Sequence, residues 1–342
     1  MKAVRLDGCQ FHNGPGEASL VEVPDPLPSP SCARIHVKAA AICMIDFELL
    51  GGTHRAAFPL TPGHEYCGVV DKVGSNTDAA WLGRRVVADN ELTCLKCSNC
   101  RRGQWRCCAE YRQFGFGPPG GYAEYVLAPI HNLHPLADTI SFEQGALLEP
   151  LGVALAATSM GKTHLGSTSA ILGAGPIGLN CLAVLKASGA RRIVCLDKRK
   201  MRLARAKSWG TLETAEDPQD FKKLSTGLHP FGANVVIEAT GDVNMIPLGI
   251  SSTRFGGCFV LAGFYKHCAL QFGPDSILGR NIRFLGAGTN CGFIEPAADA
   301  VADGVLSTQG MITHRFRLED YARAFSEEQI AAPDYVKGIF IL

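Results

Sequence analysis

Four cysteines lie close together in the sequence, at a spacing that suits a metal ion. Separated by two, two and seven residues, they are Cys94, Cys97, Cys100 and Cys108. Four thiolates can complete a tetrahedral shell around zinc, and such a shell leaves no position free for a reactant. Spacing alone does not decide between Cys108 and its neighbour Cys107 as the fourth ligand. We therefore expect a lobe that holds a structural zinc within residues 90–110.

A second set of metal-binding residue types is spread more widely along the chain. Cys43, the adjacent pair His64 and Glu65, and Glu149 offer one sulfur, one nitrogen and one oxygen ligand. Three protein ligands with a fourth position open are typical of a catalytic zinc. Each residue alone has an ordinary explanation, because a lone Cys is usually buried core and a Glu before Pro150 usually ends a helix. Together they predict a reactive metal site.

A glycine-rich turn lies between an apolar run, Ala170–Leu172, and a helical stretch. The residues of this turn that we expect to bind a ligand are Gly173, Gly175, Pro176, Ile177 and Gly178. Between a strand and a helix, such glycines let the backbone approach a pyrophosphate, whose charge the helix N-terminus stabilises. The alternative is a tight turn without a ligand. In this context the turn predicts a dinucleotide site.

Asp197 lies 19 residues after Gly178, at the end of the next expected strand. An acid at that position binds the ribose hydroxyls and repels a 2′-phosphate, which favours NAD. The basic residues that follow could hold a 2′-phosphate or form the solvated start of a helix; they are Lys198, Arg199, Lys200 and Arg202. We expect NAD because the acid makes the more direct contact.

The composition argues against several classes of protein. Lys and Arg total 33 and Asp and Glu total 32, so the net charge of +1 argues against a nucleic-acid or membrane partner. No run approaches the length of about 18 apolar residues that a membrane helix needs. The start, Met1–Asp7, reaches an acid too early for a signal peptide. Fourteen Cys in such a chain indicate thiols and metal rather than disulfides, and a cytoplasmic protein.

The first part of the chain has the pattern of short strands separated by Gly and Pro. Alternating apolar and polar residues predict strands at Ala33–Ala39, Gly68–Val73, Arg85–Ala88 and Tyr122–Leu127. These strands predict a partly open antiparallel barrel over residues 1–145. Ser141 and Gln144 then form a capping box that opens a helix, and Pro150 is expected to break or kink it.

From Thr168 the pattern alternates between strands and helices, which predicts a doubly wound parallel sheet over residues 146–289 and an α/β fold class. The expected strands are Ser169–Leu172, Arg192–Asp197, Thr211–Thr214, Asn234–Ala239, Cys258–Ala262 and Ile282–Gly286, with a helix at Met201–Trp209. Ligands bind where such strands end. The residues expected there are Thr240, Gly263, Phe264, Gly288 and Thr289, with ordinary turn residues as the alternative.

The last part of the chain, residues 290–342, is expected to return to the first domain. Its pattern predicts a helix near Leu318–Glu328 and a final strand at Val336–Leu342.

The order of these motifs resembles the zinc-containing medium-chain dehydrogenase/reductase (alcohol dehydrogenase) family, and most closely its polyol, threonine and sugar dehydrogenase branch. The resemblance covers essentially the whole chain. It implies a GroES-like catalytic domain and a Rossmann domain, with two zinc ions and NAD. By position, Cys43 and His64 would bind the catalytic zinc, with Glu65 or Glu149 as third ligand. Cys108 matches the fourth structural ligand, and Asp46 matches the acid that hydrogen-bonds the zinc-bound histidine.

The chain departs from this family where a proton leaves the substrate. The family usually has Ser or Thr two residues after the first Cys ligand and often has His three residues later, whereas this chain has Ile45 and Glu48. We hypothesise that Glu48, or Glu65 or Glu149 through water, removes the proton. A solvated surface acid is the alternative for Glu48. The candidate pocket residues are Met44, Glu48, His54 and Phe116.

The resemblance implies hydride transfer from a secondary alcohol to NAD, which gives a ketone. An acid at Glu48 favours a hydroxyl of an amino sugar or aminocyclitol, as in aminoglycoside antibiotic biosynthesis, and a simple polyol or threonine-type substrate is the alternative. The alternative interpretations of the sequence are a cofactor-sensing or structural relative, a zinc-free quinone reductase and a zinc ribbon for nucleic acid. The resemblance also implies a homodimer or homotetramer, formed by edge pairing near Ile282–Leu285.

Overall fold

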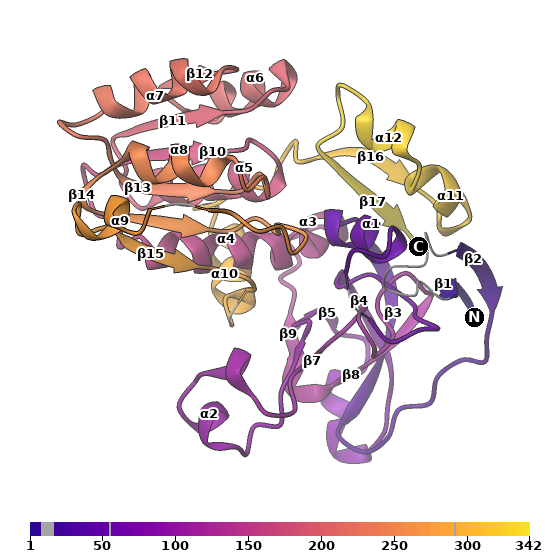
Figure 1. The fold of residues 1–342 in the computed structure, drawn as a ribbon. Helices are drawn as coiled ribbons and strands as arrows, with labels where there is room; N and C mark the ends of the chain where they lie inside the picture. Colours follow the sequence, from indigo (N-terminus) through magenta and orange to yellow (C-terminus); the bar gives the residue numbers. More distant parts are fainter. Residues whose placement is uncertain (8–16, 55, 272, 291) are drawn as a thin grey trace. The chain divides into compact units, whose positions relative to one another are not determined.

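In the computed structural model, the chain divides into two compact units (Figure 1). The structure describes residues 1–7, 17–54, 56–271, 273–290 and 292–342. The first unit contains Met1–Glu149, Ile294–Ala302 and Thr308–Leu342, and the second contains Pro150–Phe293 and Asp303–Ser307. The end of the chain therefore belongs to the same unit as its beginning.

The first unit is built mainly from strands. They are β1 (Lys2–Asp7), β2 (Glu17–Glu22), β3 (Cys32–Ala41), β4 (Glu65–Val73), β5 (Arg85–Ala88), β6 (Glu91–Leu92), β7 (Arg112–Gln113), β8 (Tyr125–Pro129), β9 (Leu133–Pro135), β16 (Ile312–Phe316) and β17 (Lys337–Ile341). Its helices are α1 (Met44–Leu50), α2 (Ser98–Arg101), α3 (Phe142–Ala146), α10 (Ile294–Ala302), α11 (Tyr321–Ala324) and α12 (Glu327–Ala331).

Seven of these strands form one sheet, in the order β16-β17-β3-β4-β5-β9, with β8 also paired to β3. The pairs are antiparallel except β16 with β17, which is parallel, so the expected antiparallel barrel has one parallel pair. Alternate residues of β3 are buried, as the sequence pattern predicts. The core beneath the sheet includes Ile35, Tyr66, Tyr122 and Phe340.

One predicted strand begins later than expected. The apolar pattern of Tyr122–Leu127 reads as a single strand, yet β8 starts at Tyr125. The preceding residues pair elsewhere, because the Val4 N–H donates to Tyr122 O and the Glu124 N–H donates to Lys2 O. The segment thus passes from one pairing partner, β1, to another, β3.

The second unit is a six-stranded parallel sheet with helices between its strands. The strands are β10 (Thr168–Leu172), β11 (Arg192–Leu196), β12 (Glu213–Ala215), β13 (Ala233–Glu238), β14 (Thr253–Leu261) and β15 (Arg283–Gly286). The helices are α4 (Leu148–Met160), which begins at the end of the first unit, α5 (Pro176–Ala187), α6 (Lys200–Ser208), α7 (Pro218–Gly227), α8 (Met245–Ser252) and α9 (Asp275–Leu278). The strands lie in the order β12-β11-β10-β13-β14-β15. The chain adds strands outward from β10 on one side and then from β13 on the other, which confirms the doubly wound topology.

Helix boundaries follow the expected signals. Ser141 accepts from the N–H of Gln144 and the Gln144 side chain returns the bond, so the capping box is present. The helix breaks before Pro150. α3 ends at Ala146, because Pro150, four residues later, has no N–H to donate to the Ala146 carbonyl. The single helix expected near Leu318–Glu328 is instead a 3₁₀ turn followed by α11 and α12, because Ser326 caps a new helix.

Candidate metal and cofactor sites

The pairing of β3 with β4 brings Cys43, His64 and Glu65 together. Ala41 of β3 is opposite Glu65, the first residue of β4, so Cys43 after one strand lies beside His64 before the other. One ligand atom from each of the three side chains lies within 4.8 Å of the other two. His64 and Glu65 are buried and Cys43 is partly buried. The cluster has the spacing of a three-ligand metal site.

Asp46 lies behind His64. Its Oδ2 accepts the Cys43 N–H at 2.9 Å and the Tyr122 hydroxyl at 2.5 Å. Its Oδ1 lies 3.8 Å from Nδ1 of His64. Burial raises the pKa of Asp46, while the nearby His64 and Tyr122 act in the opposite direction. Because Nδ1 faces Asp46, Nε2 is the His64 nitrogen that a cation could take.

The donor set fits zinc. It supplies one sulfur, one imidazole nitrogen and one carboxylate oxygen, and the buried atoms Asp46 Oδ1 and His64 Nδ1 have no hydrogen-bond partner. Burial and then the Glu65 carboxylate raise the pKa of the Cys43 thiol well above its usual value. A cation at this point would offset both costs, since metal binding favours the thiolate.

Lys337 forms a buried ion pair with Glu65. Its Nζ lies 2.7 Å from each carboxylate oxygen of Glu65, and Lys337 is only 3% exposed. It stands on β17, whose residue Ile339 is opposite Ala41 of β3. Burial lowers the pKa of Lys337, but the charges on Glu65 and Cys43 raise it by more. The pair therefore places the Lys337 ammonium directly against the Glu65 carboxylate.

Glu149 lies outside the cluster. It is buried, and its Oε1 accepts the side-chain amide of Asn90 at 2.8 Å. Burial and then the Glu65 carboxylate raise its pKa well above the usual value. The sequence leaves Glu65 and Glu149 open as the third ligand, and the structure groups Glu65 with Cys43 and His64.

The expected pocket residues have different environments. Phe116 is in ring contact with both His64 and His54, with centroid separations of 5.3 and 5.1 Å. Glu48 is only 9% exposed and its carboxylate accepts the hydroxyl of Thr53. The alternative that Glu48 is a solvated surface acid is therefore wrong. Met44 is 50% exposed, on the first turn of α1.

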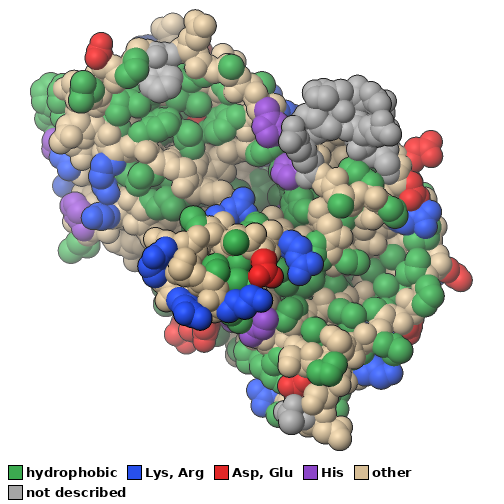
Figure 2. All heavy atoms as spheres, turned by 60° about the horizontal axis from the view of Figure 1, so that its bottom comes forward, with side chains coloured by type: hydrophobic (Ala, Val, Ile, Leu, Met, Phe, Trp, Pro, Cys, Tyr) green, Lys and Arg blue, Asp and Glu red, His purple; other side chains and the backbone are tan. Residues whose placement is uncertain are grey.

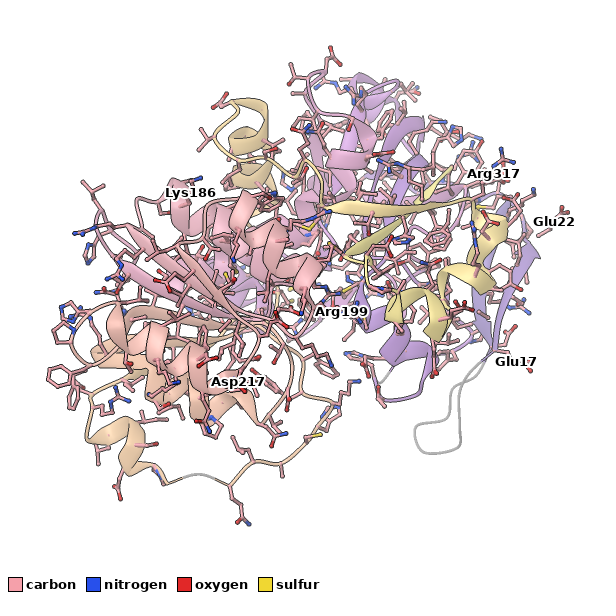
Figure 3. All side chains as sticks on the ribbon, turned by 90° about the horizontal axis from the view of Figure 1, so that it is seen from above. Glu17, Glu22, Lys186, Arg199, Asp217 and Arg317 are labelled. Atoms are coloured by element: carbon pink, nitrogen blue, oxygen red, sulfur yellow. The ribbon has the colours of Figure 1, made fainter. Side chains whose placement is uncertain are left out.

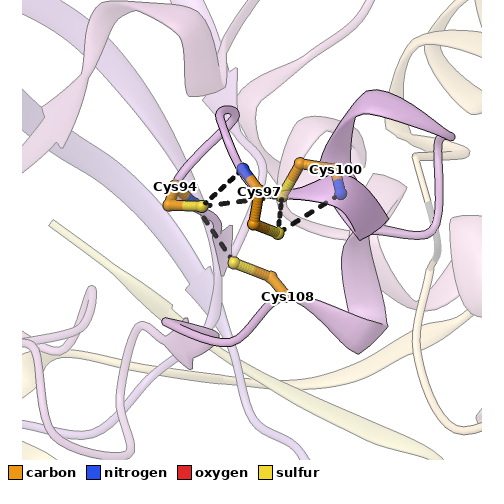
Figure 4. A group of neighbouring side chains, drawn as sticks. All are labelled: Cys94, Cys97, Cys100 and Cys108. Carbon is orange, nitrogen blue, oxygen red and sulfur yellow. Dashed lines mark hydrogen bonds between the residues drawn. The ribbon is translucent and has the colours of Figure 1, made fainter.

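The cysteine lobe holds four thiols at metal-binding distance. One sulfur from each of Cys94, Cys97, Cys100 and Cys108 lies within 4.8 Å of the others, and Cys107 is exposed and outside the group (Figure 4). Backbone N–H groups donate to the sulfurs of Cys94, Cys97 and Cys108 at 3.3 to 3.5 Å. These bonds lower the pKa of Cys97 to about 6, whereas burial raises that of Cys100 to about 12.

Four thiols so close together have no covalent bridge between them, and the twelve cysteines that the structure describes are all free. Backbone N–H donors that favour thiolates, arranged around one point, fit a four-sulfur zinc shell. The lobe therefore offers the donors that the sequence predicts, and resolves the choice of Cys108 over Cys107 by geometry.

The glycine-rich turn is held close to β10 and α5. Gly173 has φ +95°, and a side chain at Gly178 would lie 1.8 Å from Gly173 O, so neither position tolerates one. Gly175 caps α5 and Pro176 occupies its first turn, where the missing N–H costs no helical bond. Asp197 Oδ2 accepts the Ala174 N–H at 2.9 Å, which ties the turn to the end of β11.

The basic residues after Asp197 begin α6. The Arg199 N–H donates to Asp197 Oδ1 at 2.8 Å, and Arg199 precedes the helix as its cap (Figure 3). Arg202 Nη1 lies 3.9 Å from Asp197 Oδ2. A side chain at Gly175 would lie 3.5 Å from the same Arg202 nitrogen. Arg202 thus sits beside both the turn and the acid.

Two further loops meet at the carboxyl end of the sheet. Glu238, the last residue of β13, accepts from the N–H and hydroxyl of Thr240, and from the hydroxyl of Tyr265. A side chain at Gly263 would lie 2.4 Å from Gly241 N. Burial raises the pKa of Glu238, while the hydrogen bonds oppose this. Thr240 and Gly263 are therefore fixed near one another.

The remaining expected residues lie on the same edge. Phe264 is 37% exposed and follows β14, and Thr289 is buried beyond β15. Gly288 has open space where a side chain would stand. These positions follow the ends of parallel strands, where ligands bind in such sheets.

Several residues of these sites were not predicted from the sequence. Tyr122, Lys337, Asn90, Glu238 and Tyr265 each contact a predicted residue through hydrogen bonds or an ion pair. Only Lys337 has a signal that could have identified it: it is a lysine within an apolar run, and a buried Lys needs a partner.

Comparisons with known proteins bear on the whole chain. Residues 29–138 match the family described as alcohol dehydrogenase GroES-like domain, and residues 176–302 match the family described as zinc-binding dehydrogenase. A sorbitol dehydrogenase of Halalkalibacterium halodurans is 30% identical over 322 residues, which are 92% of this chain and 93% of that protein. The chain belongs to the zinc-containing medium-chain dehydrogenase family.

Other relatives also match over nearly the whole chain. D-arabinitol dehydrogenase 1 of Uromyces fabae is 29% identical over 93% of this chain and 92% of its own length. A solved structure from Sinorhizobium meliloti 1021, described as a zinc-binding dehydrogenase bound to NADP, has a TM-score of 0.90 at 31% identity, covering 100% of this chain and 99% of that one. This chain is thus an oxidoreductase of the alcohol and polyol dehydrogenase type, with zinc and NAD(H) as cofactors.

The helices and the surface charge relate to the expectations about membrane and nucleic-acid partners. Among the described residues, no helix is long and apolar enough to cross a membrane. The face drawn in Figure 2 carries side chains of both charge signs among apolar and uncharged polar surface.

Proposed function

We propose that this dehydrogenase oxidises a secondary alcohol of a polyol or sugar to a ketone, reversibly, with NAD. The observation that carries the proposal is the cluster of Cys43, His64 and Glu65, with ligand atoms within 4.8 Å of one another. Relatives named for sorbitol and D-arabinitol support the substrate class. A cofactor-sensing or structural relative would not need a complete set of donors, so the set argues against a non-enzymatic role.

Zinc bound by these donors would supply a Lewis acid for the substrate oxygen, and NAD would accept the hydride. Cys43 and Glu65 provide two negative charges for the cation, and Lys337 holds the Glu65 carboxylate in place. Asp46 faces Nδ1 of His64 and so reserves Nε2 for the cation. Phe116 packs against the His64 ring and presents an apolar surface that excludes water. In the cysteine lobe, the four thiols would hold a second zinc.

The hydroxyl proton needs an acceptor other than residue 45, since Ile45 has no group that can pass it on. We assign this role to Glu48, which is buried and bonded to the hydroxyl of exposed Thr53. Thr53 can return the proton to solvent. Glu65 or Glu149 acting through water is the alternative route.

NAD is the proposed cofactor because Asp197 stands at the end of β11, where an acid repels a 2′-phosphate. Its carboxylate already accepts the N–H groups of Ala174 and Arg199, which fixes its orientation toward the turn. Arg202 is the residue that would favour a 2′-phosphate instead. The ratio of kcat/KM for NAD to that for NADP measures which charge dominates.

A second candidate substrate is a hydroxyl on an amino sugar or aminocyclitol. The buried carboxylate of Glu48 favours it, because a cationic amine would gain an ion pair in a site of low exposure. The relatives from Uromyces fabae and Halalkalibacterium halodurans are named for the polyols D-arabinitol and sorbitol, and neither supports a part in aminoglycoside biosynthesis. A plain polyol is therefore the first candidate.

A substrate screen tests the proposal. NADH formation is measured for polyols, sugars and their amino analogues, together with the zinc content of the protein. We expect two zinc ions per chain, turnover of secondary alcohols, and loss of turnover with loss of one zinc in His64→Ala. One zinc per chain in the natural protein, or turnover unaffected by His64→Ala, would overturn the proposal. Equal rates on neutral and amino substrates would exclude the pairing with Glu48.

We also propose a homodimer or homotetramer. β15 is an end strand of its sheet and so presents unpaired backbone groups, and Leu285 on it is 36% exposed. A monomer in light scattering would contradict this proposal. No nucleic-acid or membrane partner is proposed.

A further inference from the structure

Tyr122 connects the hydrophobic core of the first unit to the candidate zinc site. Its side chain is fully buried, and its hydroxyl lies 2.5 Å from Asp46 Oδ2 and 3.1 Å from Ala41 O. A phenol has one proton to donate. The shorter contact goes to a carboxylate, which is the stronger acceptor, so Asp46 receives the proton.

Asp46 has few other contacts that set its orientation. Its Oδ2 also accepts the Cys43 N–H at 2.9 Å, whereas Oδ1 has no hydrogen-bond partner and lies 3.8 Å from His64 Nδ1. Two donors thus hold one oxygen and leave the other to face the imidazole. Of the two, only Tyr122 approaches from outside the short helix α1 that carries Asp46.

The tyrosine ring itself cannot move easily. It stacks over Gly63, where a side chain would lie 2.6 Å from the ring. Its centroid lies 5.0 Å from that of Phe340 at 68°, and 5.8 Å from that of Phe325 at 53°. These contacts come from β17 and from the end of α11. The hydroxyl is therefore presented from a rigid packed cluster.

We infer that Tyr122 is a positioning residue, which sets the zinc affinity of Cys43, His64 and Glu65 by holding Asp46 against Nδ1 of His64. It touches neither substrate nor cofactor in this role. The inference rests on the proposed function, since it requires zinc at these three residues. It goes further in assigning part of the site's affinity to a hydroxyl in the hydrophobic core.

The test is Tyr122→Phe, which keeps the ring and removes the hydroxyl. A chelator first removes zinc from Cys43, His64 and Glu65 under conditions that leave one zinc per chain in the cysteine lobe, and the protein is then titrated with zinc against a chromogenic competitor. Losing an outer partner of a metal ligand costs about 10- to 100-fold in affinity. Tyr122 is one contact further away and the Cys43 N–H remains, so we expect a dissociation constant raised by about three- to tenfold.

The matched control is Tyr66→Phe. Tyr66 is equally buried in the same core, but its hydroxyl has no hydrogen-bond partner. Its removal should leave zinc affinity unchanged. A purely structural role for Tyr122 predicts loss of stability in the zinc-free protein with no change in zinc affinity, which would overturn the inference.

A double-mutant cycle tests whether Tyr122 acts through Asp46. Asp46→Asn weakens zinc binding on its own, and adding Tyr122→Phe should then have no further effect on affinity. Full additivity would show that Tyr122 does not act through Asp46 and would overturn the inference. If the natural protein binds no zinc beyond that in the cysteine lobe, the proposed function fails instead, so the two failures are distinguishable.

Discussion

At the scale of single residues, the candidate zinc site is a balance of buried charges. Glu65 and Lys337 are both almost fully buried and 2.7 Å apart, and Asp46 lies nearby with one oxygen unpaired. Removing one member of a buried pair leaves an uncompensated charge, at a cost of about 3–5 kcal/mol. The site is therefore sensitive to residues that bind neither substrate nor cofactor.

Glu48→Gln should slow oxidation at least about tenfold, because a positioned base typically contributes 10²–10⁴-fold. The amide retains the size of the carboxylate but cannot take a proton. Steady-state kcat in the direction of alcohol oxidation is the measurement. Thr53→Val serves as the comparison, since it removes the hydroxyl that bonds Glu48 but keeps the carboxylate. Unchanged turnover in Glu48→Gln would remove this residue from the mechanism.

At the scale of elements, the site depends on strand register. Residue types and spacing were enough to predict Cys43 and His64 as partners, but the strand predicted to begin at Gly68 in fact begins at Glu65. The apolar alternation is unreadable there because Glu65, Tyr66 and Cys67 are all buried. Tyr122 and Lys337 could not be assigned from the sequence, since their partners are 76 and 272 residues away.

Gly63→Ala should destabilise the protein by about 3 kcal/mol. The residue has φ +96°, where an alanine costs about 1–2 kcal/mol, and the new methyl would also press on the Tyr122 ring. Gly83→Ala separates these causes, because Gly83 has φ +75° but open space around it. Urea unfolding should give a smaller loss, about 1–2 kcal/mol, for Gly83→Ala. Equal losses would refute the clash.

The ion pair between Glu143 of α3 and Arg315 of β16 should make stability depend on pH. Arg315 donates to both carboxylate oxygens of Glu143 at 2.7 Å and lowers the pKa of Glu143. A lowered pKa gives stability that is present above the usual value of 4.5 and is lost as pH falls through the folded value. Because both side chains are partly exposed, Arg315→Gln should cost about 0.5 kcal/mol at neutral pH.

Urea unfolding of both proteins across pH checks this expectation. The difference between the natural protein and Arg315→Gln should shrink toward zero below pH 4.5. A difference that grew on acidification would contradict the assignment of the pair.

At the scale of the whole molecule, the two proposed zinc ions have separate supports. The three-ligand cluster depends on β3, β4 and β17, whereas the cysteine lobe is held by its own short turns, α2 and backbone N–H bonds. Sequence spacing predicted the lobe almost completely, since all four donors lie within 15 residues. The three-ligand cluster was harder to predict because Cys43 and His64 meet only through the pairing of β3 with β4, and the partner of Glu65, Lys337, comes from the other end of the chain.

Cys97→Ser should lower the metal content from two zinc ions per chain to one, because a neutral hydroxyl cannot replace a thiolate in a four-sulfur shell. Metal analysis by mass spectrometry is the measurement. Cys107→Ser is the control, since Cys107 is exposed and outside the group, and should keep two zinc ions. Loss of zinc in the control would mean that the fourth ligand is Cys107.

The position of Lys337 on the last strand also has a consequence for biosynthesis. During translation, Cys43, His64 and Glu65 leave the ribosome long before the lysine that balances Glu65 has been made. The Rossmann sheet lies wholly between them in the chain and can form first. The edge of β3 therefore stays unpaired, and Glu65 lacks its ion-pair partner, until residues 337–341 emerge from the exit tunnel.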